Sequence, residues 1–104
     1  MTAIAILSVA PVIEGSMAAQ VAKAVEALDD HEVRYETTPM GTIIEADEAR
    51  TIFKAAADAH AAVDTDRVST FLKLDDKRMD SGSAADKVDS VEEQLGRSAS
   101  GDNR

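Results

Sequence analysis

The segment from Thr38 to Glu45 holds the residue types whose spacing best suits the binding of a small molecule. It reads Thr-Pro-Met-Gly-Thr-Ile-Ile-Glu, which places two hydroxyl groups and one carboxylate around a tight turn beside an apolar strand. Hydroxyl groups both donate and accept hydrogen bonds, whereas an ionised carboxylate accepts them. The threonines are also ordinary strand residues, and Glu45 is an ordinary strand-end residue. Composition alone favours this structural interpretation, so the binding interpretation stays open at this point.

The two histidines and one charged run are the other candidates for chemistry. His31 and His60 have no second histidine at metal-ligand spacing. His31 is predicted at the end of a helix, where a partly positive imidazole offsets the macrodipole. His60 falls on an apolar stripe, which indicates a hydrogen-bonded core residue, with contact to a bound molecule as the alternative. The run 75–80 lacks the glycine and the final glutamate of a calcium loop, so we interpret it as a solvated loop.

Motifs of catalysis are missing from the sequence. It has no phosphate-binding glycine loop, no His-Glu-x-x-His and no cysteine nucleophile. We therefore expect a binding protein without catalytic residues, metal or cofactor. Two alternatives stay open: a dimeric ferredoxin-like barrel enzyme with His60 in its cavity, and a regulatory or scaffolding module that binds another protein.

The first half of the chain predicts a strand, a helix and a hairpin. Residues 3–9 are apolar on both faces, as in a central strand that is covered on each side. Ser16 can cap a helix that runs to about Asp30. Alternation then predicts a hairpin over residues 33–45, in which Pro39 supplies a fixed φ and Gly41 a positive φ. The apolar positions of the predicted helix are Met17, Val21, Ala24, Val25 and Leu28.

The second half predicts a helix, a strand and an appended helix. Asp47 can cap a helix that ends near Asp64. Residues 67–74 alternate as a strand, and Ser83 with Asp86 has the spacing of a capping box before a helix that ends at Gly96. The apolar face predicted for the first of these helices comprises Ala49, Ile52, Phe53, Ala56, His60 and Val63.

This β-α-β-β-α-β order predicts an α+β, ferredoxin-like sandwich with an added C-terminal helix, in which both main helices cover one face of the sheet. Because the first strand is apolar on both faces, we expect a second subunit to cover the other face. The expected organisation is one domain over residues 1–96, a disordered tail over residues 97–104, and a homo-oligomer that assembles sheet to sheet.

The charge balance disfavours two classes of partner, nucleic acid and membranes. Twenty acidic residues against 11 basic ones give a formal net charge of −9. Such a surface repels nucleic acid and anionic membranes. We interpret it as a halophilic adaptation to a high-salt cytoplasm. The absence of cysteine and of a signal or spanning segment in this sequence favours a cytoplasmic protein.

Three strings resemble the MTH1187/YkoF-like thiamine-binding family over residues 3–95. They are Pro-Met-Gly-Thr-Ile-Ile-Glu at 39–45, the alanine-rich helix that contains Ala59-His60, and Lys-Leu-Asp-Asp-Lys-Arg at 73–78. The resemblance implies ferredoxin-like subunits that assemble through their sheets into dimers and often tetramers. It also implies binding of thiamine or its hydroxymethylpyrimidine part without chemical change.

The resemblance also suggests which residues bind the ligand. An aminopyrimidine presents an amino donor beside a ring-nitrogen acceptor, which a carboxylate and hydroxyl groups can satisfy. Glu45 is then the expected polar anchor, with Thr38 and Thr42 beside it. Ser16 could add a hydrogen bond, and Asp75 is a weaker candidate near a thiazolium cation.

Overall fold

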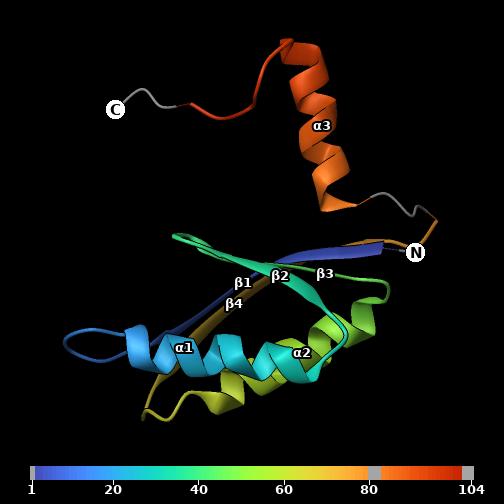
Figure 1. Cartoon of the computed structure of the whole chain (residues 1–104). Coiled ribbons are helices and arrows are strands. Elements are labelled where there is room, and N and C mark those ends of the chain that lie inside the picture. Colours follow the sequence, from blue (N-terminus) through green and yellow to red (C-terminus); the bar gives the residue numbers. More distant parts are fainter. Residues whose placement is uncertain (1, 80–82, 102–104) are drawn as a thin grey trace.

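The computed structural model describes residues 2–79 and 83–101 (Figure 1). Its described residues form an α+β fold, as predicted, with a third α-helix added at the C-terminal side. The strands are β1 (Thr2–Pro11), β2 (Arg34–Thr38), β3 (Gly41–Ala46) and β4 (Val68–Lys77). The α-helices are α1 (Ala18–Ala27), α2 (Ala49–Ala62) and α3 (Ala84–Leu95), and a short 3₁₀ helix η1 (Leu28–Asp30) extends α1.

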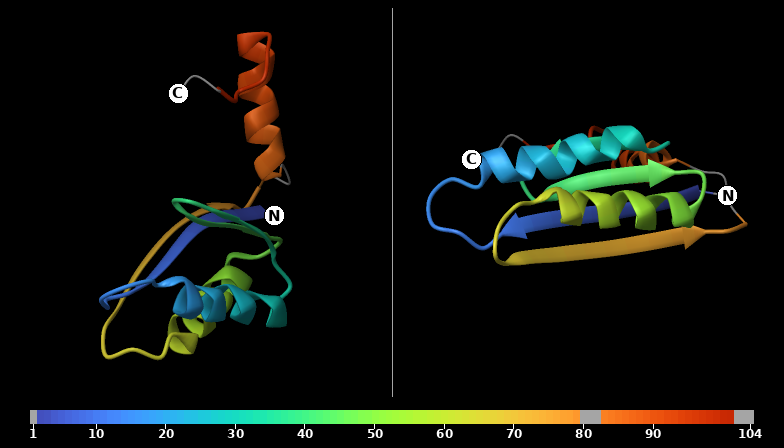
Figure 2. Two further views of the ribbon diagram at one scale, coloured as in Figure 1. Left: turned by 60° about the vertical axis from the view of Figure 1, so that its left-hand side comes forward. Right: turned by 90° about the horizontal axis from the view of Figure 1, so that it is seen from below.

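The four strands form one antiparallel sheet in the order β2-β3-β1-β4, which is the ferredoxin-like arrangement. Helices α1 and α2 lie side by side over one face of this sheet (Figure 2). Strand β1 is central and pairs with both β3 and β4, so that Ile6 lies opposite Ile43 on one side and Lys73 on the other. None of the helices in the described part of the chain is long and apolar enough to span a bilayer.

The core lies between the sheet and the two helices, and small side chains make up much of it. Alternate residues of β1 point into it, ending at Leu7 and Val9. The larger fully buried side chains include Leu28, Ile44 and Ile52. The alanines of the core are Ala3, Ala5, Ala24, Ala46, Ala55, Ala56 and Ala59. Because alanine adds little bulk, the helices can approach the sheet closely, and the core is thin, as the composition predicts.

The opposite face of the sheet, here called the open face, carries Ile4, Ile6 and Ile43, which are half-buried, and Phe71, which is 60% exposed. Helix α3 is on this side and points away from the sheet (Figures 1 and 2). Strand β1 thus carries apolar side chains on both of its faces. Helices α1 and α2 cover one face of the sheet, and the first turn of α3 lies over part of the other (Figure 2).

The β2–β3 hairpin follows the predicted turn chemistry. Pro39 and Met40 form a two-residue turn, and Gly41 adopts a positive φ of 145°. A Cβ atom at Gly41 would also lie 3.0 Å from the carbonyl oxygen of Leu7 and 3.2 Å from the side chain of Ile6. Glycine is therefore required here by the backbone conformation and by the close approach of β1.

Three local predictions are wrong. Phe53 is 55% exposed and His60 is also exposed, because the core face of α2 is formed by Ile52, Ala55, Ala56, Ala59 and Val63 instead. Asp47 does not cap α2, whose N-cap position is Glu48 without a side-chain cap bond.

The predicted loop at 75–80 is wrong for its first three residues, since Asp75, Asp76 and Lys77 extend β4 opposite Ile4, Ala3 and Thr2. Asp80 lies outside the described residues. The capping box of α3 and its glycine C-cap are confirmed, because Ser83 and Asp86 bond reciprocally and Gly96 has a φ of 72°. Of the predicted tail, residues 97–101 are described and form no helix or strand.

Candidate functional site

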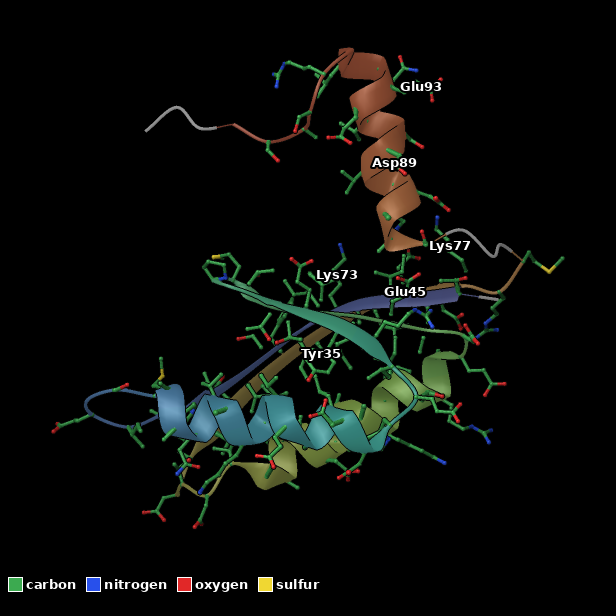
Figure 3. All side chains as sticks on the ribbon, viewed as in Figure 1. Tyr35, Glu45, Lys73, Lys77, Asp89 and Glu93 are labelled. Atoms are coloured by element: carbon green, nitrogen blue, oxygen red, sulfur yellow. The ribbon has the colours of Figure 1, made fainter. Side chains whose placement is uncertain are left out.

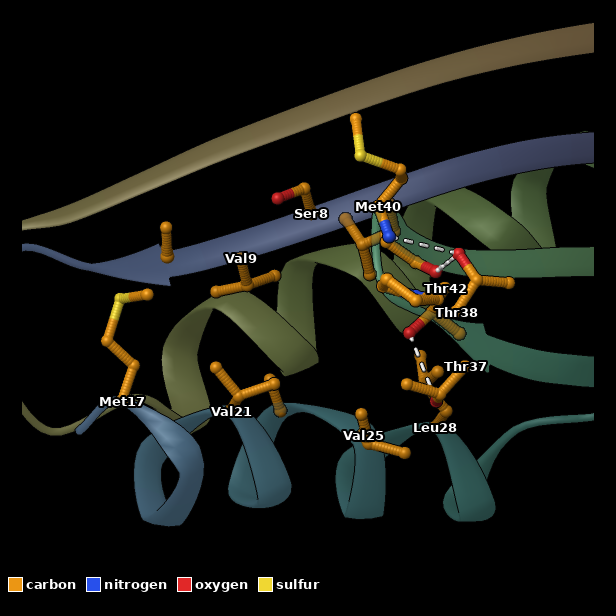
Figure 4. Close-up of a pocket in the computed structure, with 15 residues that line it drawn as sticks. Ser8, Val9, Met17, Val21, Val25, Leu28, Thr37, Thr38, Met40 and Thr42 are labelled. Carbon is orange, nitrogen blue, oxygen red and sulfur yellow. Dashed lines mark hydrogen bonds between the residues drawn. The ribbon is translucent and has the colours of Figure 1, made fainter. Parts of the chain in front are cut away.

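A cavity of about 210 Å³ lies between α1 and the β2–β3 hairpin, on the helix-covered side of the sheet (Figure 4). One wall is the apolar face of α1, with Met17, Val21 and Val25. The opposite wall is the hairpin, including Thr37, Thr38, Met40 and Thr42, and β1 lines the cavity between them with residues 7–10.

The position of α1 explains why the cavity exists. The apolar face of this helix becomes less buried toward its N-terminus, from Leu28 at 1% exposed, through the half-buried Val25 and Val21, to Met17 at 45%. The C-terminal end is therefore packed against the sheet, whereas the N-terminal end leaves apolar surface uncovered. At the packed end, the hydroxyl of Tyr35 donates a hydrogen bond to Asp29 Oδ1 over 2.6 Å and joins β2 to η1.

The cavity contains paired threonine hydroxyl groups. Thr37 Oγ1 and Thr42 Oγ1 lie 3.3 Å apart and form a hydrogen bond across the hairpin, where the two residues are register partners. One of their two protons occupies that bond, so the other proton and several lone pairs can serve a ligand. Thr38 is more fully engaged, since its hydroxyl donates to the Gly41 carbonyl over 2.7 Å and accepts from the Met40 N–H over 3.2 Å.

Charge is absent from this cavity: none of the described residues that line it is ionisable. Its hydrogen-bonding side chains are hydroxyl groups, set among valine, leucine, alanine and methionine. Such a lining suits a neutral, mainly apolar ring with a few polar edge atoms. Elsewhere, the described residues contain no cluster of three or more His, Cys, Asp or Glu side chains placed to hold a metal ion.

The structure brings two of the expected ligand residues into the cavity, Thr38 and Thr42. Ser16 is next to Met17 at the cavity edge but does not line the cavity, and its Oγ accepts a hydrogen bond from the Ala18 N–H over 3.3 Å. Glu45 and Asp75 lie on the open face of the sheet. The expected grouping of Glu45 with the two threonines is therefore not found.

On the open face, both acids contact α3. Glu45 Oε1 accepts a hydrogen bond from the Ala84 N–H over 3.3 Å and lies 3.8 Å from Arg34 Nη2. Asp75 Oδ2 accepts a 2.9 Å hydrogen bond from Lys87 Nζ. The ammonium group of Lys87, by this hydrogen bond and by its charge, holds the pKa of the Asp75 carboxyl below its ordinary value.

A second, wider hollow of about 550 Å³ lies beneath the first turns of α3 and is lined by residues that include Arg34, Ile43, Glu45 and Val88. The carboxylate of Glu45 in this hollow already has the Ala84 N–H and the Arg34 guanidinium as partners. This carboxylate thus serves contacts within the chain. The cavity beside α1, with free hydrogen-bonding capacity, is the better candidate site.

The division of Thr42 from Glu45 follows from strand geometry. Successive side chains of a strand point to opposite faces, so residues three positions apart lie on different faces. The same rule and the two-residue turn place Thr37 opposite Thr42, on the cavity side. Thr37 was missed by the sequence analysis, although this alternation was available to identify it.

Neither histidine lies in the cavity. His31 Nε2 and Asp58 Oδ2 are 2.7 Å apart, which joins the end of η1 to α2. His60 Nδ1 forms a hydrogen bond with the Thr70 hydroxyl of β4. Both imidazoles therefore have structural partners within the fold.

Known proteins are similar to this chain in sequence and in fold. A family model described as "Thiamine-binding protein" matches residues 5–92. A UPF0045 protein of Methanothermobacter thermautotrophicus is 45% identical over 83 residues, which cover 77% of this chain and 84% of that protein. The UPF0045 protein MJ1052 of Methanocaldococcus jannaschii is 35% identical over 95 residues, 88% of this chain and 87% of its own length.

Solved structures agree. The crystal structure of MJ1052 superposes with a TM-score of 0.80 at 32% identity and covers 88% of this chain and 97% of that one. A Thermotoga maritima protein, described as a candidate thiamine biosynthesis/salvage protein, has a TM-score of 0.75 at 19% identity and covers 88% and 99%. The second likeness supports the fold alone. With most of its length matched by the family model and by two relatives above 30% identity, the chain belongs to the thiamine-binding protein family.

Proposed function

We propose that the protein binds an aminopyrimidine, either hydroxymethylpyrimidine or the pyrimidine ring of thiamine, in the cavity between α1 and the β2–β3 hairpin, and does not transform it. The observation that carries this proposal is the uncharged cavity of about 210 Å³ with the Thr37–Thr42 hydroxyl pair. Membership of a thiamine-binding family supplies the ligand class.

The size of the cavity favours a single ring. Drug-sized ligands occupy sites of roughly 300–1,000 Å³, which is larger than this cavity. A pyrimidine ring would fill it, and the thiazolium ring of thiamine would extend outward past Met17 and Met40. Both methionines are exposed. Their flexible thioethers can contact the edge of an aromatic ring.

The hydrogen-bonding capacity matches the same ring. The proton that is free in the Thr37–Thr42 pair can be donated to a ring nitrogen, and a hydroxyl lone pair can accept from the exocyclic amino group. A phosphate ester has no cationic partner among the described residues of the cavity. We therefore expect unphosphorylated ligands to bind more tightly than phosphorylated ones.

The proposed setting is the cytoplasm of a cell with high internal salt. A formal charge of −9 on 104 residues repels itself, and salt screens this repulsion as the Debye length falls from about 10 Å at 0.1 M to about 3 Å at 1 M. The thermal midpoint should therefore rise when potassium chloride is raised to molar concentration. An unchanged midpoint would contradict the halophilic interpretation.

Calorimetric titration in molar potassium chloride tests the binding function. Hydroxymethylpyrimidine, thiamine and thiamine phosphate are titrated into the protein, and then into Thr42→Val, which removes the hydroxyl at nearly constant volume. Thr51→Val, on α2 and away from the cavity, is the matched control. We expect saturable binding of the first two ligands, unchanged in the control. A folded protein that binds neither pyrimidine would contradict the proposal.

A further inference from the structure

Helix α1 is fixed at its C-terminal end and less firmly held at its N-terminal end. Leu28 is buried in the core, and the hydroxyl of Tyr35 bonds to Asp29 and ties β2 to η1, which extends this helix (Figure 3). His31 adds a hydrogen bond from the end of η1 to α2. At the other end, no described residue of α1 before Ala24 is buried. The N-terminal half of α1 therefore has little core packing to fix its position.

The side chain of Gln20 supplies a specific contact for this half of the helix. Its Oε1 accepts a 3.0 Å hydrogen bond from the backbone N–H of Asp64, in the loop between α2 and β4. In the described part of the chain, no other side chain of α1 forms a hydrogen bond or an ion pair outside the helix. Gln20 is partly buried, so the bond is partly shielded from water. One hydrogen bond thus joins the N-terminal half of α1 to the neighbouring loop.

This bond acts in the direction that keeps the cavity open. Figure 1 shows the tip of the β2–β3 hairpin on one side of α1 and the loop between α2 and β4 on the other, and the left view of Figure 2 agrees. The cavity lies between α1 and the hairpin. The hydrogen bond from Gln20 to Asp64 therefore holds the N-terminal half of α1 away from the hairpin.

The lining of the cavity favours the opposite movement. Met17, Val21 and Val25 line it from α1, and none of the three is fully buried. Burial of apolar surface is favourable, and water finds few partners against an apolar wall. If α1 tilted about its fixed end toward the hairpin, these side chains would be buried and the cavity would narrow. A ring-sized cavity persists only where another contact opposes that closure.

We propose that Gln20 is a positioning residue, whose hydrogen bond to Asp64 sets the distance between α1 and the hairpin and keeps the cavity wide enough for a pyrimidine ring. Gln20 acts through α1, since it is not among the described residues that line the cavity. This role rests on the proposed function, because it concerns the width of the same site. The apparent affinity is then the affinity of the open form multiplied by the fraction of molecules that are open.

Substitutions of Gln20 separate a positioning role from a merely structural one. Gln20→Ala removes the acceptor, and calorimetry should show about a three- to tenfold loss of affinity for hydroxymethylpyrimidine, because one hydrogen bond cannot favour the open form by more than its own contribution. Gln20→Glu keeps an oxygen acceptor, and molar potassium chloride screens its charge, so it should restore the affinity. The free energy of unfolding should change little in Gln20→Ala, since closure buries apolar surface as the bond is lost. A merely structural role would lower stability together with affinity.

Lys23→Ala is the matched control. Lys23 lies about one turn further along α1, is exposed, and is not among the described residues that line the cavity. The substitution shortens a long polar side chain on the same helix, so affinity and the free energy of unfolding should both stay unchanged. A loss of affinity equal to that of Gln20→Ala would show a general effect of the helix surface and would overturn the role of Gln20.

Nuclear magnetic resonance reports the width of the cavity without any ligand. Overhauser effects from the methyl groups of Val21 to those of Thr37 and Thr42 strengthen as α1 approaches the hairpin. They should be stronger in Gln20→Ala than in the unchanged protein, and Gln20→Glu should match the unchanged protein. Overhauser effects that are the same in all three proteins would overturn the proposal. Failure of the unchanged protein to bind any pyrimidine would instead contradict the proposed function, and the Overhauser effects would still decide whether Gln20 positions α1.

Discussion

The two faces of the sheet differ in what their polar groups do. On the helix-covered face, the cavity holds neutral hydroxyl groups in an apolar surround, with hydrogen-bonding capacity to spare. On the open face, Glu45 and Asp75 are engaged by α3, and both are register partners of Ile4. Strand β3 serves both faces, since it contributes Thr42 to one and Glu45 to the other. The string at 39–45 thus divides between the cavity and the open face of the sheet.

The largest expected effect compares neighbouring isoleucines of β3. Ile44 is fully buried, and Ile44→Ala should lower the free energy of unfolding by about 3–4 kcal/mol because it leaves a cavity in the core. Ile43 lies half-buried on the open face, so Ile43→Ala should cost less, and its cost should grow with protein concentration if the expected sheet-to-sheet homo-oligomer forms. Urea unfolding at two protein concentrations measures both. If both variants lost the same free energy of unfolding at both protein concentrations, the two faces of the sheet would not differ in burial as described.

The next effect concerns the hairpin that shapes the cavity. Gly41→Ala combines a forbidden φ of 145° with a Cβ atom 3.0 Å from the Leu7 carbonyl oxygen, so we expect a loss of about 3 kcal/mol. Gly15 also has a positive φ, of 84°, but nothing lies within 4 Å of its Cβ position. Gly15→Ala should therefore cost about 1 kcal/mol. Chemical unfolding of the two variants gives the free energy of unfolding of each. The difference between their losses measures the steric clash at position 41.

Ligand affinity gives the most direct comparison of the two faces. Thr42→Val should weaken binding of hydroxymethylpyrimidine about fivefold, or about 1 kcal/mol, because one neutral hydrogen bond is lost. Glu45→Gln should leave the affinity unchanged, since this side chain is on the other face. Calorimetry of both variants decides the location. The reverse result would place the ligand in the hollow beneath α3.

The smallest effect is the titration of Asp75. Its pKa is lowered from 3.8 by the hydrogen bond and charge of Lys87. Because the folded-state pKa lies below the unfolded one, the contribution to stability is present above pH 3.8 and is lost as the pH falls through the folded-state value. Nuclear magnetic resonance titration of the carboxyl should show this shift. In Lys87→Met the pKa should return toward 3.8, and an unchanged value would exclude Lys87 as its cause.

The elements of the fold were predictable because their signals are local. The hairpin follows from Pro39 and Gly41, and α3 from Ser83, Asp86 and Gly96. The extension of β4 through Lys77 was not predictable, because its hydrogen bonds come from the distant Thr2 end of β1. A charged segment that is typical of a loop can form a strand when a neighbouring strand provides backbone hydrogen-bond partners.

The core face of α2 shows a different limit. Phe53 was expected inside because it falls in the helical pattern of apolar residues, yet Ala55, Ala56 and Ala59 occupy the interface. Hydrophobicity ranks phenylalanine above alanine, but a closely approaching helix favours small side chains at most of its contact positions, with Ile52 as the larger one. The cavity could not be predicted from the sequence for a similar reason. The uncovered apolar surface at Val21 and Met17 depends on how α1 lies over the sheet. The separation of Thr42 from Glu45, by contrast, follows from alternation and was available from the sequence.

The strand order also bears on solubility. With β2 and β4 at the two edges, each has unpaired backbone groups that could recruit a strand from a neighbouring molecule. The ten-residue β4 is the larger hazard, and its second half carries Lys73, Asp75, Asp76 and Lys77. Charged side chains on an edge strand discourage lateral growth into fibrils. The charged run that extends β4 should therefore disfavour open-ended association of sheets edge to edge.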